Sequence, residues 1–168
     1  MSDADGAHAD RGSADSSAGV FTNVHGDRYP AVAAELAAQL PQRVVTGTQQ
    51  RTVGIARIGS RMLPAIYSGA QPVWSTAAQR LLESLGVESE WLQHHVETKL
   101  VAMMIDTRQP FAEVCINFTP CGVETQQFAL DTCDKVLDDL LPPGYRLTVY
   151  GTRQDGSPFE RTYGERRA

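Results

Sequence analysis

The stretch His95-Val96-Glu97 constrains this chain most strongly when it is read together with two cysteines that follow it. Cys121 comes after a proline at the end of a predicted strand, and Cys133 begins the next predicted helix. One imidazole and two thiolates form a zinc ligand set that leaves a fourth position open for water. The order of helix, strand, Pro-Cys and helix therefore predicts an α/β fold, with helices layered on a mixed sheet of about five strands. His95, Cys121 and Cys133 would bind Zn²⁺.

Glu97 has a different expected role from the three ligands. It lies two residues from His95, or about 200° around a helix, so the two side chains would diverge in the middle of a helix. At a first turn, both can reach a pocket that lies over the helix end. There Glu97 would take a proton from water and deliver it to the ring and then to the departing amine of a cytosine. The stretch thus predicts hydrolytic deamination.

Alternatives to this zinc site remain open in the sequence. A lone His-x-Glu is common on solvated helix faces, and Cys133 also fits an apolar helical stripe, where cysteine is often plain core. Moreover, eleven residues separate Cys121 from Cys133, whereas the usual deaminase signature has two. Either residues 122–131 bulge out and return Cys133 to the metal, which we expect, or Glu124 replaces it. The neighbouring His94 is expected at the surface or behind the ligands.

The charge of the chain argues against tight, nonspecific binding of nucleic acid. Its 20 acidic residues outnumber 15 basic ones, for a net charge of −5. Phosphate contacts would therefore have to be local, because Lys and Arg carry backbone binding. The basic concentration lies near the end of the sequence and comprises Arg146, Arg153, Arg161, Arg166 and Arg167. The nearly neutral body slightly favours single-stranded over double-stranded DNA without deciding between them.

Three segments of different character follow one another along the chain. Residues 1–28 are predicted to form a disordered arm, because residues 1–20 are rich in Ala, Ser, Asp and Gly and contain no aromatic residue. Residues 29–49 are predicted to hold an N-terminal helix, stopped by Pro41, and a linker. Residues 50–168 form the predicted deaminase domain. Its expected elements are strands at 51–58 and 62–68, helices at 76–85 and 91–106, a strand at 111–118, a helix at 133–141, and strands at 146–150 and 158–163.

Targeting features point to a cytoplasmic protein. Three cysteines cannot all pair in disulfides, and two of them fit the metal pattern, which favours a reducing compartment. The sequence has no apolar run of ~18 residues that could span a membrane, and no basic region followed by an apolar one at its start. We therefore expect a cytoplasmic protein as produced. Export without a cleavable signal, followed by action in a target cell, stays open.

Four segments carry a more specific resemblance. They are His95-Val96-Glu97, Ile116-Asn117-Phe118-Thr119-Pro120-Cys121, Thr132-Cys133-Asp134 and Leu140-Leu141-Pro142-Pro143-Gly144-Tyr145-Arg146-Leu147-Thr148-Val149-Tyr150. With them, roughly residues 50–165 resemble the DddA-like bacterial deaminases, which are polymorphic-toxin domains with the cytidine-deaminase fold. The resemblance implies zinc ligands His95, Cys121 and Cys133, a proton-shuttling Glu97, and conversion of DNA cytosine to uracil. It also implies an immunity protein as partner if the chain is a toxin.

The substrate-binding residues are less well defined by the sequence. A base inside a duplex cannot be reached, so the target nucleotide must be flipped out or single-stranded. Aromatic side chains could stack on it, although each also suits a core. The candidates are Asn117 for the sugar or pyrimidine edge, Phe118, Tyr67 and Trp74 for stacking, and Thr119. The segment Gln126-Gln127-Phe128 could overhang the site.

Two other functions compete with DNA deamination. A deaminase of free nucleosides or bases would enclose its substrate, and an oligomer that seals the pocket would favour it. A non-catalytic module, in which the metal stabilises the fold alone, would need a fourth protein ligand such as Glu124 or His94. The chain is otherwise expected to be a monomer that binds cytosine-containing DNA and no membrane.

Overall fold

The structure, a computed structural model, describes residues 19–124 and 131–165. Its α-helices are α1 (Ala34–Ala37), α2 (Pro72–Ser84), α3 (Val96–Asp106) and α4 (Cys133–Leu140), with 3₁₀ turns η1 (Ala31–Ala33) and η2 (Leu92–His94). Its strands are β1 (Val20–Thr22), β2 (Arg28–Pro30), β3 (Val53–Ile58), β4 (Arg61–Met62), β5 (Ile66–Tyr67), β6 (Phe111–Ile116), β7 (Arg146–Thr152) and β8 (Pro158–Tyr163). None of the helices in these ranges is long and apolar enough to cross a bilayer.

A mixed sheet forms the centre of the molecule. Its strand order is β4-β3-β6-β7-β8, and β5 also pairs with β3. The β6–β7 pair is parallel, whereas β3–β6 and β7–β8 are antiparallel. This confirms the predicted α/β fold. The sheet has six strands because the single return strand expected at 62–68 is split into β4 and β5. Pro64 lies between them and cannot donate a ladder hydrogen bond.

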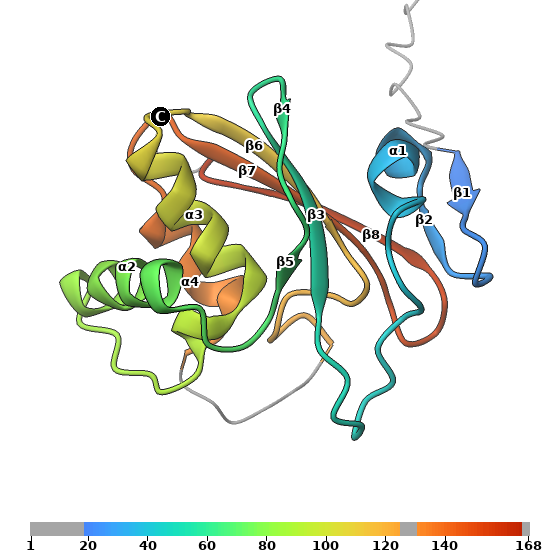
Figure 1. Cartoon of the computed structure of the whole chain (residues 1–168), viewed down its shortest axis with the longest axis horizontal. Helices are drawn as coiled ribbons and strands as arrows, with labels where there is room; N and C mark the ends of the chain where they lie inside the picture. Colours follow the sequence, from blue (N-terminus) through green and yellow to red (C-terminus); the bar gives the residue numbers. More distant parts are fainter. Residues whose placement is uncertain (1–18, 125–130, 166–168) are drawn as a thin grey trace, which may run out of the picture.

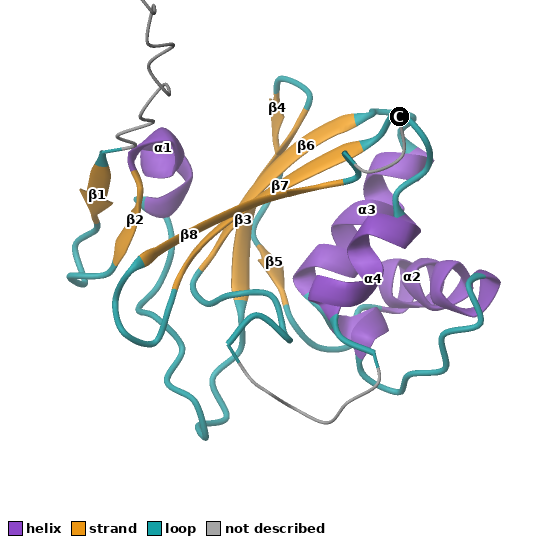
Figure 2. Cartoon of the chain, turned by 180° about the vertical axis from the view of Figure 1, so that it is seen from behind, coloured by secondary structure: helices purple, strands orange, loops and turns teal. Residues whose placement is uncertain are grey.

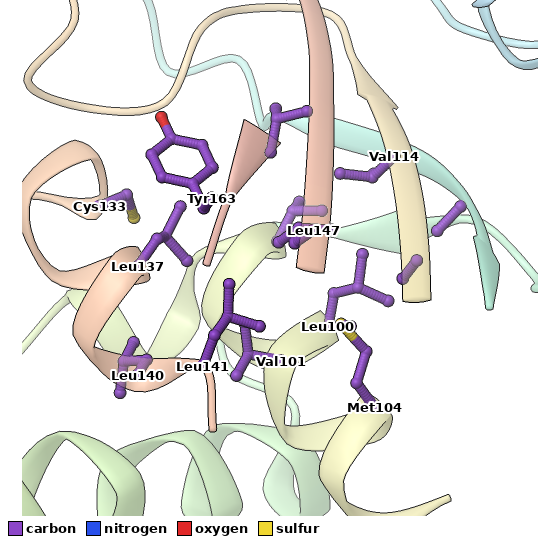
Figure 3. Close-up of a cluster of buried hydrophobic side chains, with 14 of the residues drawn as sticks. Leu100, Val101, Met104, Val114, Cys133, Leu137, Leu140, Leu141, Leu147 and Tyr163 are labelled. Carbon is purple, nitrogen blue, oxygen red and sulfur yellow. The ribbon is translucent and has the colours of Figure 1, made fainter. Parts of the chain in front are cut away.

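Helices α2, α3 and α4 cover one face of this sheet (Figure 1). The larger hydrophobic core lies beneath them. Helix α4 buries Cys133, Val136, Leu137 and Leu140, as its i, i+3, i+4, i+7 spacing predicts. Figure 3 shows Cys133, Leu137 and Leu140 on the side of α4 that faces α3 and the sheet residues Val114 and Leu147. The chain passes from β6 to its parallel neighbour β7 through α4, so both cysteines of the motif lie in this crossover.

The opposite face carries a smaller layer, made of α1 and the β1–β2 hairpin (Figure 2). Here Tyr29, Leu36 and Leu40 are buried in a second hydrophobic cluster. This layer differs from the expectation for residues 1–49. Residues 19–28, expected in the disordered arm, form most of the hairpin, whose turn is stabilised by Asn23 Oδ1 accepting hydrogen bonds from two backbone N–H groups. Residues 1–18 lie outside the described ranges.

The predicted N-terminal helix is also shorter than expected. Pro30 ends β2, and regular α-helix is confined to Ala34–Ala37. Val32, four residues before the buried Leu36, is 67% exposed and so does not share a buried helical face with it. The alanine-rich sequence after Tyr29 suggested a helix that begins at that residue. Tyr29 instead pairs with Phe21 in the β1–β2 hairpin, and this pairing is not visible in the local sequence. The linker that follows leaves this layer and leads into β3.

Candidate active site and metal centre

His95 and Glu97 are separated by the start of a helix. The helix expected from residue 91 is interrupted, because His95 is extended, with φ −75° and ψ 151°, between η2 and α3. His95 is therefore the N-cap residue of α3, and Glu97 lies in the first turn of that helix. In a continuous helix, His95 and Glu97 would point about 200° apart. This does not apply here, because His95 lies before the helix and only Glu97 lies within it. Both reach the pocket over the helix end, and Glu97 is only 3% exposed.

Val96, the residue between them, packs directly against the central sheet. A Cβ atom on Gly54 of β3 would lie 2.4 Å from Val96 Cγ1, so a side chain at this position would displace the motif. Glycine weakens a strand and is found where something must approach the backbone closely. Gly54 thus lets the helix start settle on β3, which fixes the depth of His95 and Glu97 in the molecule.

The two cysteines meet because the ends of the intervening segment meet. Gly122 has φ +94°, and a Cβ there would lie 2.2 Å from Thr132 Oγ1. The backbone N–H of Cys133 donates to Cys121 Sγ at 3.0 Å, and that of Asp134 donates to the Cys121 carbonyl at 3.1 Å. Cys133 is therefore brought back beside Cys121 despite the long spacing. Gln126-Gln127-Phe128, predicted to overhang the site, lies outside the described residues.

His95, Cys121 and Cys133 form one compact group of potential ligands. His95 Nδ1 lies 3.2 Å from Cys133 Sγ and 3.6 Å from Cys121 Sγ. Tetrahedral ligands ~2.0–2.3 Å from a zinc ion lie about 3.5 Å from one another. The two distances from His95 are therefore close to those of a zinc site, and the three atoms, all within 4.8 Å of one another, could hold a metal ion.

The electrostatics of the group also suit a cation. The pKa of Cys121 is lowered by its hydrogen bond with Cys133 and by the nearby His95 imidazole. The pKa of Cys133 is raised by its hydrogen bond with Cys121 and by burial. Without a cation the buried pair therefore favours a single thiolate. A divalent ion between the sulfur atoms would stabilise both thiolates. Burial raises the pKa of the Glu97 carboxyl, and His95 opposes that shift.

A pocket of about 300 Å³ opens over these groups. One side is formed by His95, Val96 and Glu97 and by the turn that carries Cys121. The other side is formed by the segment between α1 and β3, which the sequence analysis treated as a linker. Its lining residues are Val44, Val45, Thr46, Gly47, Thr48, Gln50 and Thr52. Apart from the turn residues Gly47 and Thr48, no residue type or motif in the sequence of this segment indicated that it would line a pocket.

Gln154, in the β7–β8 turn, connects the two sides of the pocket. Its Nε2 donates to the Val44 carbonyl at 3.0 Å, and its backbone N–H donates to Glu124 Oε1 at 2.9 Å. The other oxygen of Glu124 accepts from Thr119 Oγ1 at 2.9 Å. Arg43 adds to this connection by donating to the carbonyls of residues 153 and 154. The bonds of Gln154 to Val44 and of Arg43 to residues 153 and 154 were not predictable, because they join segments more than a hundred residues apart.

The two alternative ligands have other partners. Glu124 lines the pocket, but its carboxylate is held by Thr119 and Gln154, as described above. His94 Nδ1 lies 3.0 Å from Ser75 Oγ on α2. Neither residue belongs to the group of three, and among the described residues this group has no fourth protein ligand. A metal ion held by these three side chains would therefore keep one coordination position for water.

The predicted substrate-binding residues separate into two sets. Phe118 and Thr119 line the pocket. Asn117 is 2% exposed, and its side chain is used inside the fold: Oδ1 accepts from Val53 N–H and Nδ2 donates to the Gln42 carbonyl. Tyr67 is 54% exposed and lines a different hollow, whereas Trp74 lies half-buried on α2 outside the pocket lining. Asn117 therefore anchors the pocket wall rather than facing the pocket.

The arginines near the end of the chain do not converge on the pocket. Arg161 is paired with Asp134 at 2.6 Å and with Asp138 at 3.6 Å. The Arg153 guanidinium lies 5.1 Å from the centre of the Phe159 ring. Arg146 begins β7, at the end of the sheet opposite the site. Arg166 and Arg167 lie outside the described residues. None of the described arginines lines the pocket, and their contact with phosphates stays a prediction.

Comparisons with known proteins place this site in a family. A comparison with curated proteins found no match. A sequence model of the SCP1.201-like deaminase family, however, matches residues 26–166. That range contains Glu97, the three potential ligands, the Gly54 contact and both sides of the pocket. The chain therefore belongs to the SCP1.201-like deaminase family, and the group formed by His95, Cys121 and Cys133 lies in its deaminase domain.

Proposed function

We propose that this protein is a zinc-dependent cytosine deaminase of the DddA-like branch that converts cytosine in DNA to uracil. The observation that carries the proposal is the meeting of Glu97 with His95 and Cys121 in the wall of one pocket. Cys133 completes the ligand group from behind, where it is fully buried. A histidine, two cysteines and a non-ligand glutamate are the set that zinc deaminases use.

Each residue of the site has a separate part in this reaction. Zinc held by the imidazole and the two thiolates would supply the Lewis acidity that makes water nucleophilic at neutral pH. Glu97 takes one proton from the attacking water and passes it to ring N3 of cytosine, while the water oxygen adds to C4. It then moves the remaining proton from the new C4 hydroxyl to the amine, which leaves as ammonia as the C4 carbonyl of uracil forms. Burial raises the pKa of Glu97 because it disfavours the charged carboxylate, so Glu97 is a stronger base than an exposed glutamate would be.

The pocket suits one flipped or unpaired nucleotide. Its volume of about 300 Å³ accommodates a pyrimidine and its sugar, and one side of it remains open. Phe118 in the lining offers a face for stacking on the base, and Thr119 a hydroxyl close to it. We favour single-stranded DNA, since the acidic chain would have to neutralise fewer phosphates.

The cellular role follows from the resemblance to the DddA-like branch. A monomer is made in the cytoplasm and acts as a toxin effector after export, without a cleavable signal, into a target cell. An immunity protein that covers the open side of the pocket would protect the producer. Coexpression with proteins encoded next to it, followed by deamination assays, tests this role separately from the chemistry.

A free-nucleoside deaminase is the second candidate, because the pocket volume also suits cytidine alone. The deciding experiment incubates the zinc-loaded protein with cytosine-containing single-stranded DNA, the matching duplex, and cytidine. Uracil formation in DNA, lost in Glu97→Ala with zinc retained, is the expected result. Turnover of cytidine with no uracil in either DNA would replace the proposal with the second candidate.

A further inference from the structure

Thr119 and Glu124 form a hydrogen-bonded pair in the wall of the pocket. Both residues line the pocket, as does Cys121 between them. Thr119 Oγ1 donates to Glu124 Oε2 at 2.9 Å, and Glu124 Oε1 accepts from the Gln154 N–H at 2.9 Å. Only 3% of Thr119 is exposed, so its hydroxyl has little access to bulk water as another partner. The direction of the Thr119 hydroxyl is therefore set by the protein itself.

The backbone before Thr119 is anchored to the central sheet. The Phe118 carbonyl accepts from the Thr152 N–H at 3.1 Å. A Cβ on Gly151 of β7 would lie 2.2 Å from that same carbonyl oxygen, so only glycine allows this approach. Cys121 follows Thr119 by two residues. Thr119 is thus held against β7 on the same short segment as a potential metal ligand.

The bond to Glu124 leaves the Thr119 hydroxyl as an acceptor toward the pocket. A threonine hydroxyl has one proton and two lone pairs, whereas a carboxylate has no proton and only accepts. Because Thr119 gives its proton to Glu124, the hydroxyl can offer only lone pairs to another molecule. Glu124 also lines the pocket as an acceptor. The side chains of this pair therefore suit a ligand that carries an N–H donor.

A cytosine nucleotide within a DNA strand has one such donor. Its ring N3 and O2 accept hydrogen bonds, its phosphates accept, and its deoxyribose has no free hydroxyl. The 4-amino group alone carries N–H, and it is attached to C4, the carbon at which deamination takes place. The amino group must therefore lie close to the metal ligands during the reaction, which is the part of the wall that holds Thr119 and Cys121.

Resting on the proposed function, we infer that Thr119 accepts a hydrogen bond from the 4-amino group of the target cytosine. Glu124 is then a positioning residue, because it orients the Thr119 hydroxyl and does not need to touch the base itself. Uracil carries the acceptor O4 at this place, and two facing acceptors cannot bond. The pair would thus favour the substrate over the product and help uracil to leave the pocket.

The test compares Thr119→Val with Thr148→Val. Thr148 is a matched control, because its hydroxyl is also bonded to a side chain, Thr162 Oγ1 at 2.9 Å, but it does not line this pocket. The measured quantities are KM for a cytosine-containing oligonucleotide and the inhibition constant Ki of the same oligonucleotide with uracil. We expect Thr119→Val to raise KM about ten-fold without raising Ki. Thr119→Ser should keep most of the wild-type preference, and Thr148→Val should behave as wild type.

Glu124→Gln tests whether orientation of the hydroxyl is what matters. A glutamine has one accepting oxygen and one donating NH₂ group. If its oxygen keeps the Gln154 N–H, its NH₂ group donates to Thr119 Oγ1 and the hydroxyl proton is free to point into the pocket. Uracil O4 then gains a donor while the amine of cytosine loses its acceptor. We therefore expect Glu124→Gln to lower Ki for the uracil oligonucleotide as well as raise KM for cytosine.

The two substrates of the deciding assay separate this inference from the proposed function. If wild type deaminates DNA but Thr119→Val leaves both constants unchanged, or raises both equally, the inference is overturned and the function stands. If wild type deaminates cytidine and not DNA, the function fails. The inference then stands only if Thr119→Val raises KM for cytidine without raising Ki for uridine, since a contact with the sugar would affect both equally. Turnover of neither substrate overturns both.

Discussion

The two faces of the central sheet contribute to the same pocket in different ways. From the α2–α4 face come the groups that do chemistry, carried on the backbone at the starts of α3 and α4 and supported by the larger core. From the α1 face comes the linker wall at residues 44–52, joined to the rest by side-chain hydrogen bonds. Packing places the catalytic atoms, whereas polar contacts between distant segments place the substrate-facing wall.

Removing a metal ligand should break this arrangement most severely. Cys133→Ser should reduce metal affinity by more than ~100-fold and bring deamination to background, since even supporting residues around a metal contribute 10–100-fold. Metal content by plasma emission spectrometry and the thermal midpoint give readouts beside activity. Cys115→Ala is the matched control, because Cys115 is equally buried but packs in the cluster of the α1 face. Full metal content in Cys133→Ser would refute the ligand assignment.

Glu97→Gln should remove the proton transfer while leaving the metal bound. We expect kcat to fall ~10²–10⁴-fold, the usual contribution of a positioned acid–base group. The metal content should stay unchanged, because Glu97 is not a member of the ligand group. The exposed Glu160→Gln serves as control. A variant that keeps wild-type kcat would show that another group moves the proton.

Leu36→Ala tests whether the α1 face folds together with the rest. Leu36 is 1% exposed in the smaller cluster, so its truncation should lower the free energy of unfolding by about 2–5 kcal/mol. Below the midpoint of unfolding, kcat should change little, because the catalytic groups rest on the other core. Val32→Ala, in the same segment but 67% exposed, should cost far less. Equal midpoints for the two variants in urea unfolding would contradict the burial of this face.

The smallest expected effect comes from the bond that connects the two sides of the pocket. Gln154→Ala removes the donor to the Val44 carbonyl, a bond of about 1 kcal/mol, so KM should rise roughly five-fold. Stability and metal content should stay close to wild type. Gln79→Ala, which removes an exposed side-chain bond on α2, is the control. An unchanged KM would mean that the linker wall keeps its position, or does not touch substrate.

The chemical side of the pocket was largely predictable, and the linker side was not. His95, Cys121 and Cys133 could be found because their residue types and order carry a specific chemistry, and the apolar spacing of α4 located the helix that holds Cys133. By contrast, Asn117 looked like a substrate contact because of its sequence distance from Cys121. Its bond to Val53 depends on the register between β3 and β6, and its bond to Gln42 depends on the path of the segment before β3. The local periodicity of the sequence predicts neither the register nor the path.

Gly122 and Thr132, at the two ends of the segment between the cysteines, lie in close contact. The sulfur positions are therefore set by this closure and by the two backbone bonds to Cys121, and not by the number of residues beyond it. For a chain closed at its base, each doubling of length costs only ~0.6 kcal/mol of entropy. A change in the number of residues between Gly122 and Thr132 should thus leave the two sulfur atoms where they are.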